Sequence, residues 1–130
     1  AGFIGSPTMN FLAAEVVGVG DGLAAQGKGF SLPLDPATAS RLASMTRRPV
    51  TIGIRPTAFT TKATESGSLA LSVIVAEYLG ASAVLATMCG DQEVLVETTA
   101  SPLPKPGETV RFGVPPGAIM IFDNNNGQRL

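Results

Sequence analysis

The stretch PVTIGIRPTAF, residues 49–59, decides the fold that we predict for this chain. Apolar residues alternate in it with small, polar or charged ones, and the apolar set is Val50, Ile52 and Ile54. A period of two is typical of a strand with one face toward a core. Pro56 has no backbone N–H to donate to a sheet, so we expect the strand to stop or turn there. Arg55 should then lie at a strand end, directly before a rigid corner.

On either side of this strand, short apolar runs are separated by glycine and proline. Eight short strands are expected in all, at residues 11–19, 30–34, 50–54, 69–79, 83–89, 94–97, 110–114 and 119–122. Five residues of the fourth strand should share one face: Leu69, Leu71, Val73, Val75 and Leu79. The run at 83–89 is nearly all apolar, so we expect it to be buried on both faces.

One short helix interrupts the predicted strands. Asp35 is a favourable N-cap and Pro36 a favourable first helical residue, and the helix should end near Thr46. Alternating strand and helix units are absent, so a parallel nucleotide-binding sheet is not expected. The strand spacing instead predicts an all-β sandwich or small barrel with one short helix.

The composition is that of a globular protein. Hydrophobic residues make up 45% and charged residues 15% of the chain. Its length of 130 residues suffices for one ordinary domain or for two very small ones that share a core. The formal net charge is −1, and no basic cluster exceeds the pair Arg47-Arg48. This balance argues against nucleic acid or an acidic membrane surface as the main partner.

Histidine is absent and cysteine occurs once, as Cys89. The absence of histidine removes every Ser-His or Cys-His nucleophile arrangement and nearly all zinc chemistry. Cys89 ends the apolar run AVLATMC, so we interpret it as a packed thiol. A single cysteine allows no internal disulfide, which fits a cytosolic compartment.

Two polar or glycine-rich stretches resemble ligand-binding loops without matching them. Residues 22–29, GLAAQGKG, approach the phosphate-binding loop, but Gly29 stands where a hydroxyl should hold magnesium. Strand-like residues 30–33 follow where a helix is needed to bind phosphate, so we interpret the stretch as a hairpin turn. The stretch DNNNG at 123–127 lacks the distal glutamate of a calcium loop and is interpreted as a surface turn.

Arg55 leaves two interpretations open. A guanidinium fixed by a rigid corner can form a forked pair with a carboxylate, and Glu77 and Asp123 are the candidates. The alternative is a solvated charge at a strand end.

Several segments together resemble one protein family. AGFIGSPTMNFL at 1–12 resembles the junction, in ATP-binding-cassette (ABC) importer ATPases of the maltose and sn-glycerol-3-phosphate type, between the nucleotide-binding domain and the C-terminal regulatory domain. Further matches follow in the same order through the whole chain: IGIRP at 52–56, VAEYLGAS at 75–82, a proline-containing loop before Gly107, VPPGAIMIFD at 114–123 and NGQRL at 126–130.

The resemblance implies a C-terminal regulatory domain of the transport-associated OB (TOBE) type. Residues 1–10 would be the tail of an upstream nucleotide-binding domain, and 11–130 the regulatory domain, with OB-like strands drawn from both halves. The family-motif or interface candidates are Gly53, Arg55, Pro56, Glu77, Gly80 and Asp123. The resemblance places such a domain in the cytoplasm, at the inner face of the membrane within a sugar transporter complex.

The resemblance also implies partners. These are a second copy of the chain, the upstream nucleotide-binding domain and, indirectly, membrane permease subunits. We expect weak self-association through the loops at 53–56 and 80–82. The chain alone should be no enzyme and hold no metal or cofactor, because ATP and Mg²⁺ are implied only for the upstream domain.

The chain departs from the family at two places. Thr57-Ala58 follows the Ile-Arg-Pro where many members carry Glu-His or Glu-Asp, and Met120 and Ile121 stand where a histidine is common. Contacts that the acidic and histidine side chains make in the family are therefore not assigned to this chain. An alternative function is a free OB-type module that binds a small ligand or oxyanion. A single-strand nucleic-acid binder is disfavoured by the charge.

Overall fold

The structure is a computed structural model and describes residues 9–20, 22–42, 49–61, 67–99, 102–124 and 127–130. Its strands are β1 (Asn10–Val19), β2 (Gly22–Gly27), β3 (Phe30–Pro33), β4 (Pro49–Ile54), β5 (Ser68–Tyr78), β6 (Ala83–Cys89), β7 (Gln92–Thr98), β8 (Thr109–Gly113) and β9 (Met120–Asp123). The helices are α1 (Pro36–Arg41) and two 3₁₀ turns, η1 (Pro56–Ala58) and η2 (Pro116–Ala118). In these ranges no helix combines the length and hydrophobicity needed to cross a membrane.

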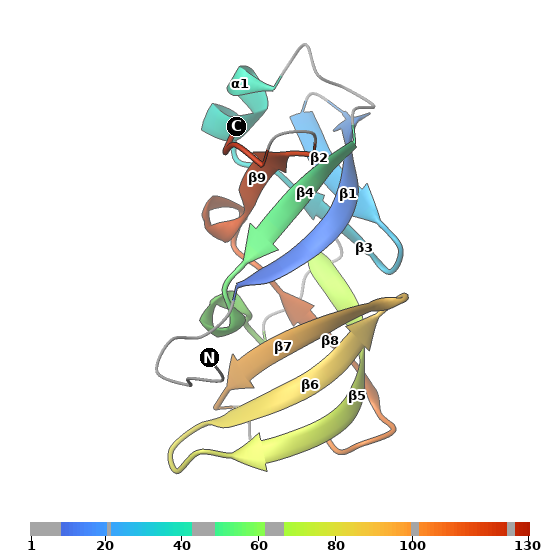
Figure 1. Cartoon of the computed structure of the whole chain (residues 1–130), viewed down its shortest axis with the longest axis vertical. Helices are drawn as coiled ribbons and strands as arrows, with labels where there is room; N and C mark the ends of the chain where they lie inside the picture. The colour runs from blue at the N-terminus through green and yellow to red at the C-terminus, as the bar shows by residue number, and fades with distance from the viewer. Residues whose placement is uncertain (1–8, 21, 43–48, 62–66, 100–101, 125–126) are drawn as a thin grey trace.

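The strands form one antiparallel sheet of nine strands in the order β7-β6-β5-β3-β2-β1-β4-β9, with β8 paired to β5 off this path. We call β1–β4 with β9 the first lobe and β5–β8 the second lobe; Figure 1 shows the first above the second. The all-β, OB-like prediction with one short α-helix is confirmed. The recorded pairing does not close on itself, so the expected barrel is an open sheet among the described strands.

The strand predicted at the centre of the chain forms as expected. Val50, Ile52 and Ile54 of β4 are each at most 1% exposed. β4 lies between β1 and β9, so it receives a partner from each end of the chain. The strand stops at Ile54, and Pro56 opens η1, which confirms the predicted corner.

The predicted helix also forms. The Asp35 side chain accepts a hydrogen bond of 2.9 Å from the backbone N–H of Thr38, and Pro36 begins the helix. Hydrogen bonds from the side chain and backbone of Thr38 hold the pKa of the Asp35 carboxyl below its ordinary value. α1 ends at Arg41, and the predicted continuation to Thr46 lies outside the described residues.

A ninth strand, β2, was not predicted. The sequence predicts that residues GLAAQG belong to a hairpin turn, but they pair with β1 on one side and β3 on the other. The turns lie outside them, at Gly20 and Gly29, whose φ angles of 58° and 86° favour glycine. Ala24 and Ala25 are buried, so a central place in the sheet overrides their weak strand propensity.

The face predicted for the fourth strand is correct only for its first half. Leu69, Leu71 and Val73 of β5 are buried, but Val75 and Leu79 are 51% and 55% exposed. The register with β6 shifts between Val73 and Val75, because an extra residue forms a bulge that reverses the faces beyond it. Burial of β6 on both faces is also wrong, because buried and half-buried positions alternate along it.

The two lobes are joined at a seam between β1 and β7 by side-chain amides. The Asn10 side chain donates to the Leu95 carbonyl and accepts from the Leu95 N–H, both at 2.8 Å. The Gln92 side chain accepts from the Ala13 N–H at 2.9 Å, in the same antiparallel register. Asn10 is only 7% exposed. Its amide thus copies the hydrogen bonds of a backbone neighbour where the strands themselves do not pair.

Replacing Asn10 should weaken this seam. We expect Asn10→Ala to lower the free energy of unfolding by about 1–3 kcal/mol. The substitution removes two hydrogen bonds and leaves the part-buried N–H and carbonyl of Leu95 without these partners. Denaturant unfolding measures the change. Asn124→Ala is the matched control: it removes an exposed side-chain bond to Thr51 and should change stability by less than about 0.5 kcal/mol. Equal effects of the two substitutions would contradict the role given to Asn10.

Candidate functional site

Three of the predicted interface candidates are buried, namely Gly53, Pro56 and Asp123. A methyl group added at Gly53 would come within 2.6 Å of the Met9 Sδ and 2.9 Å of Phe122. Glycine is therefore needed there for close packing, since Met9 and Phe122 cover that part of β4. Pro56 is buried as well. Neither Gly53 nor Pro56 presents a side chain to a partner.

The charged candidates are not brought together. Arg55 is exposed at the end of β4, and Glu77 is exposed near the end of β5 in the other lobe. Asp123 is 9% exposed, lies opposite Val50 in the sheet, and its N–H donates to the Gln128 carbonyl. Within the described ranges the recorded ion pair joins Lys28 to Asp91, at 3.5 Å. The pairing of Arg55 with Glu77 or Asp123 is thus not formed here.

The Cys89 thiol is packed, as predicted. Its side chain is fully buried and lies 3.5 Å from the Lys28 carbonyl, to which the S–H donates. Burial raises the pKa of the thiol above its ordinary value. The thiolate that nucleophilic chemistry requires is therefore disfavoured.

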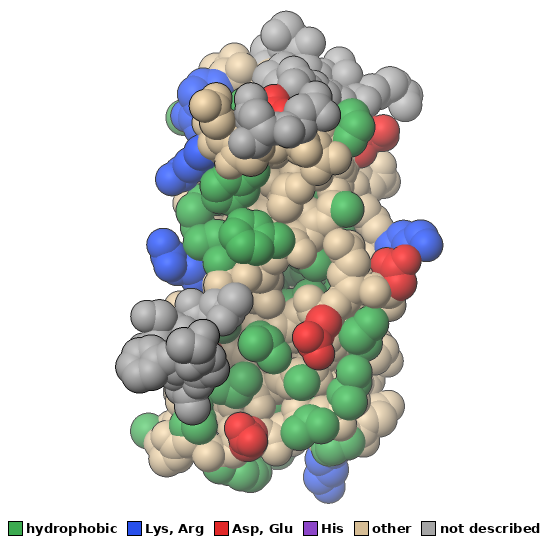
Figure 2. All heavy atoms as spheres, viewed as in Figure 1, with side chains coloured by type: hydrophobic (Ala, Val, Ile, Leu, Met, Phe, Trp, Pro, Cys, Tyr) green, Lys and Arg blue, Asp and Glu red, His purple; other side chains and the backbone are tan. Residues whose placement is uncertain are grey.

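Gly80 lies beside an exposed apolar surface that the sequence did not predict. Its φ of 83° makes the tight connection between β5 and β6, where the Leu79 N–H donates to the Ser82 carbonyl at 2.8 Å. Four large apolar side chains on this connection and the adjoining half of β5 are 47–74% exposed, namely Ile74, Val75, Tyr78 and Leu79, and we call them the β5 patch. Figure 2 shows hydrophobic side chains spread over the lower half of one face, with few charges between them.

The backbone next to this patch is also open on one edge. β8 pairs with β5 from Ser68 to Ser72, and β6 occupies the other edge from Ser72 to Tyr78. Gly107 and Glu108 extend this side to Val73, and among the described strands none continues it further. An apolar strand edge of this kind is a favourable surface for another chain.

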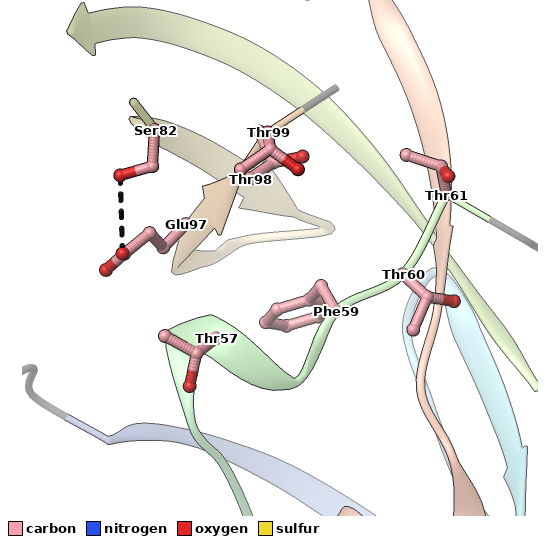
Figure 3. Close-up of a pocket in the computed structure, with 8 residues that line it drawn as sticks. All are labelled: Thr57, Phe59, Thr60, Thr61, Ser82, Glu97, Thr98 and Thr99. Atoms are coloured by element: carbon pink, nitrogen blue, oxygen red, sulfur yellow. Dashed lines mark hydrogen bonds between the residues drawn. The ribbon is translucent and has the colours of Figure 1, made fainter. Parts of the chain in front are cut away.

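A pocket of about 690 Å³ lies between the lobes. One wall comes from η1 and the residues after it, and the other from the end of β7, the residue after it and Ser82, which precedes β6 (Figure 3). The described lining residues are Thr57, Phe59, Thr60, Thr61, Ser82, Glu97, Thr98 and Thr99. All but Phe59 carry a hydroxyl or a carboxylate, so polar groups and threonine methyl groups line the pocket together, with one possible negative charge, Glu97, among these residues.

Both walls are held in place by the fold. The backbone of Thr60 makes two hydrogen bonds of 2.8 Å with Gly113 at the end of β8. The Phe59 ring packs edge-on against Phe112, with centroids 6.3 Å apart. On the opposite wall Thr98 pairs with Ala83, and the Ser82 hydroxyl lies 3.4 Å from a Glu97 carboxylate oxygen. The lining groups are thus positioned by strands and turns of both lobes.

The sequence analysis missed this pocket, although a compositional signal exists. The stretches TAFTT at 57–61 and ETT at 97–99 are the threonine-rich segments that line it. They are 36 or more residues apart in the sequence. Only the topology of the sheet brings them opposite each other.

Two family models match the chain and overlap at the central strand. The model of the MalK OB fold domain matches residues 5–59, and the model of the TOBE domain matches residues 52–122. Together they cover β1 to β9 except for the last residue of β9.

Similar curated proteins are ATP-binding proteins of transport systems. The chain is 37% identical to the sulfoquinovosyl glycerol transport ATP-binding protein SmoE of Agrobacterium fabrum, over 94% of this chain and 33% of that protein. It is 32% identical to the sn-glycerol-3-phosphate import ATP-binding protein UgpC of Salmonella choleraesuis and of Escherichia coli O1:K1, over 100% of this chain and 35% of each. The chain spans about a third of the length of these relatives.

The buried thiol provides a test of the local structure. We expect Cys89 to resist alkylation by iodoacetamide at pH 8 in the folded protein, because burial raises its pKa and limits access. In denaturant the same thiol should react at the rate of a free cysteine. Mass spectrometry of timed samples measures both rates, and equal rates with and without denaturant would contradict the packing described.

Proposed function

Because this chain belongs to the TOBE domain family, we propose that it is the regulatory, dimer-contacting C-terminal domain of an ABC importer ATP-binding subunit for a sugar or related solute. The observation that carries the proposal is the similarity to transport ATP-binding proteins over 94–100% of the chain. A match of this extent covers both lobes, so it does not favour a free OB-type module as the alternative.

The remaining two thirds of such a subunit would supply the chemistry of transport. In this proposal an upstream nucleotide-binding domain holds ATP and Mg²⁺ and contacts membrane permease subunits at the cytoplasmic face. The 130-residue chain contributes a regulatory and contact surface. The transported solute would be selected by other subunits.

A second copy of the chain is the partner proposed for the β5 patch. A contact between identical subunits around a two-fold axis uses the same surface twice, so it favours a patch without strong charge of one sign. The side chains of Ile74, Val75, Tyr78 and Leu79 are apolar, and the exposed Glu77 is the one charged side chain of β5 among them. Of the loops expected from the sequence, the one at 80–82 adjoins this patch.

Self-association tests the dimer contact. Sedimentation velocity over a concentration series should show a weak, reversible dimer of the chain, in the micromolar range or weaker because the upstream domain is absent. Val75→Lys should raise the dissociation constant at least about ten-fold, since two charges would be brought together in a contact of this symmetry.

Val19→Lys is the matched control for this experiment. Val19 is 56% exposed and Val75 51% exposed, but Val19 lies on β1, outside the patch. The control should leave the dissociation constant unchanged. A strictly monomeric chain at several hundred micromolar would contradict the dimer proposal, and equal effects of the two substitutions would contradict the choice of the β5 patch.

The chain by itself should neither bind nor hydrolyse ATP. Gly29 replaces the hydroxyl that would hold magnesium, and the stretch after it forms β3, where nucleotide binding needs a helix. Isothermal titration of the chain with magnesium-ATP should give only heats of dilution. Micromolar binding would contradict this expectation.

A further inference from the structure

We infer that the pocket between the lobes binds a neutral polyhydroxylated small molecule, of the size of a monosaccharide or disaccharide. The inference goes beyond the transporter role proposed above and does not depend on it. The volume of the pocket, about 690 Å³, falls within the range of roughly 300–1,000 Å³ typical of small-molecule sites.

The lining groups fit the hydroxyls of such a ligand. Five threonines and one serine line the pocket. The Ser82 hydroxyl already donates to Glu97 and Thr98 is buried, so the hydroxyls open to a ligand are those of Thr57, Thr60, Thr61 and Thr99, each of which can donate and accept a hydrogen bond. The hydroxyls of a sugar have the same double capacity, so donors and acceptors can be matched on both sides. The Glu97 carboxylate accepts hydrogen bonds from hydroxyls more strongly than a neutral group does.

Other ligand classes fit less well. Among the described lining residues there is no Lys or Arg, and Glu97 would repel phosphate or another oxyanion. In the described ranges no three His, Cys, Asp or Glu side chains are grouped to hold a metal ion. A purely apolar ligand would strip water from the hydroxyls without replacing its hydrogen bonds, which is unfavourable.

The place of the pocket gives binding a structural consequence. Thr57 to Thr61 follow β4 of the first lobe, whereas Ser82 and Thr98 belong to the second lobe. The wall at 57–61 is already held to β8 by the hydrogen bonds between Thr60 and Gly113, so a ligand that contacts both walls would add to an existing contact between the lobes.

Titration of the ¹⁵N-labelled chain with glucose and maltose, followed by NMR, tests the inference. We expect a dissociation constant of about 0.1–1 mM, as suits a small ligand held by several hydrogen bonds. The amide signals that shift should belong to residues 57–61, 82 and 97–99. Glucose 6-phosphate is the charged counterpart and should bind at least about ten-fold more weakly because of Glu97.

Two variants with matched controls locate the site. Glu97→Gln should weaken glucose binding about ten-fold, since a charged acceptor is lost, whereas Glu93→Gln on the same strand should have no effect. Thr57→Val should weaken it about three- to ten-fold, whereas Thr109→Val, at an exposed threonine of β8, should not. Spectra of the free variants show whether each one is folded.

Three outcomes would overturn the inference. The first is no shift with either sugar at concentrations well above the expected dissociation constant. The second is shifts that map outside the two walls, or that respond equally to Glu97→Gln and Glu93→Gln. The third is tighter binding of glucose 6-phosphate than of glucose, which would assign the pocket to anions. None of these outcomes bears on self-association, so the proposed transporter role is tested separately.

Discussion

The amide of Asn10 holds the seam at which β1 of the first lobe meets β7 of the second. The other backbone contacts between the lobes are short: β3 and β5 share the pairs Phe30–Leu69 and Ser31–Ser68, and Thr60 bridges to Gly113. The amide contacts of Asn10 with Leu95, together with that of Gln92 with Ala13, close the second line of contact along β1 and β7. η1 lies against β7, the strand that the seam joins to β1. The distance between the two pocket walls therefore depends on this seam.

Much of the fold could be predicted from local chemistry. The alternation in β4, the proline corner after Ile54 and the capping of α1 by Asp35 all depend on residues adjacent in sequence. The errors have a common origin in long-range packing. The β2 residues have the composition of a turn, and they form a strand because β1 and β3 pair with them on either side. The bulge near Ile74 moves the later side chains of β5 to the opposite face from the one that simple alternation predicts.

The candidate site was less predictable than the fold for the same reason. The family resemblance singled out Gly53, which close packing requires, and Pro56, which is buried at the start of η1, whereas the exposed β5 patch follows from the bulge. The pocket depends on two threonine-rich segments that only the sheet topology brings together. The two surfaces proposed to be functional thus lie where the two lobes meet and where a regular strand is interrupted.

The pairing of β4 with β9 also constrains how the protein can form during translation. β4 leaves the ribosome well before Met120–Asp123, and until those residues emerge its outer edge, with Val50 and Ile52, has no partner. Apolar strand edges that wait for a distant segment are sites of aggregation, and contacts of such sequence separation slow folding. A nascent chain stopped short of residue 120 would therefore expose the strand on which the first lobe is built. Chaperone demand should accordingly be highest late in synthesis, just before β9 becomes available.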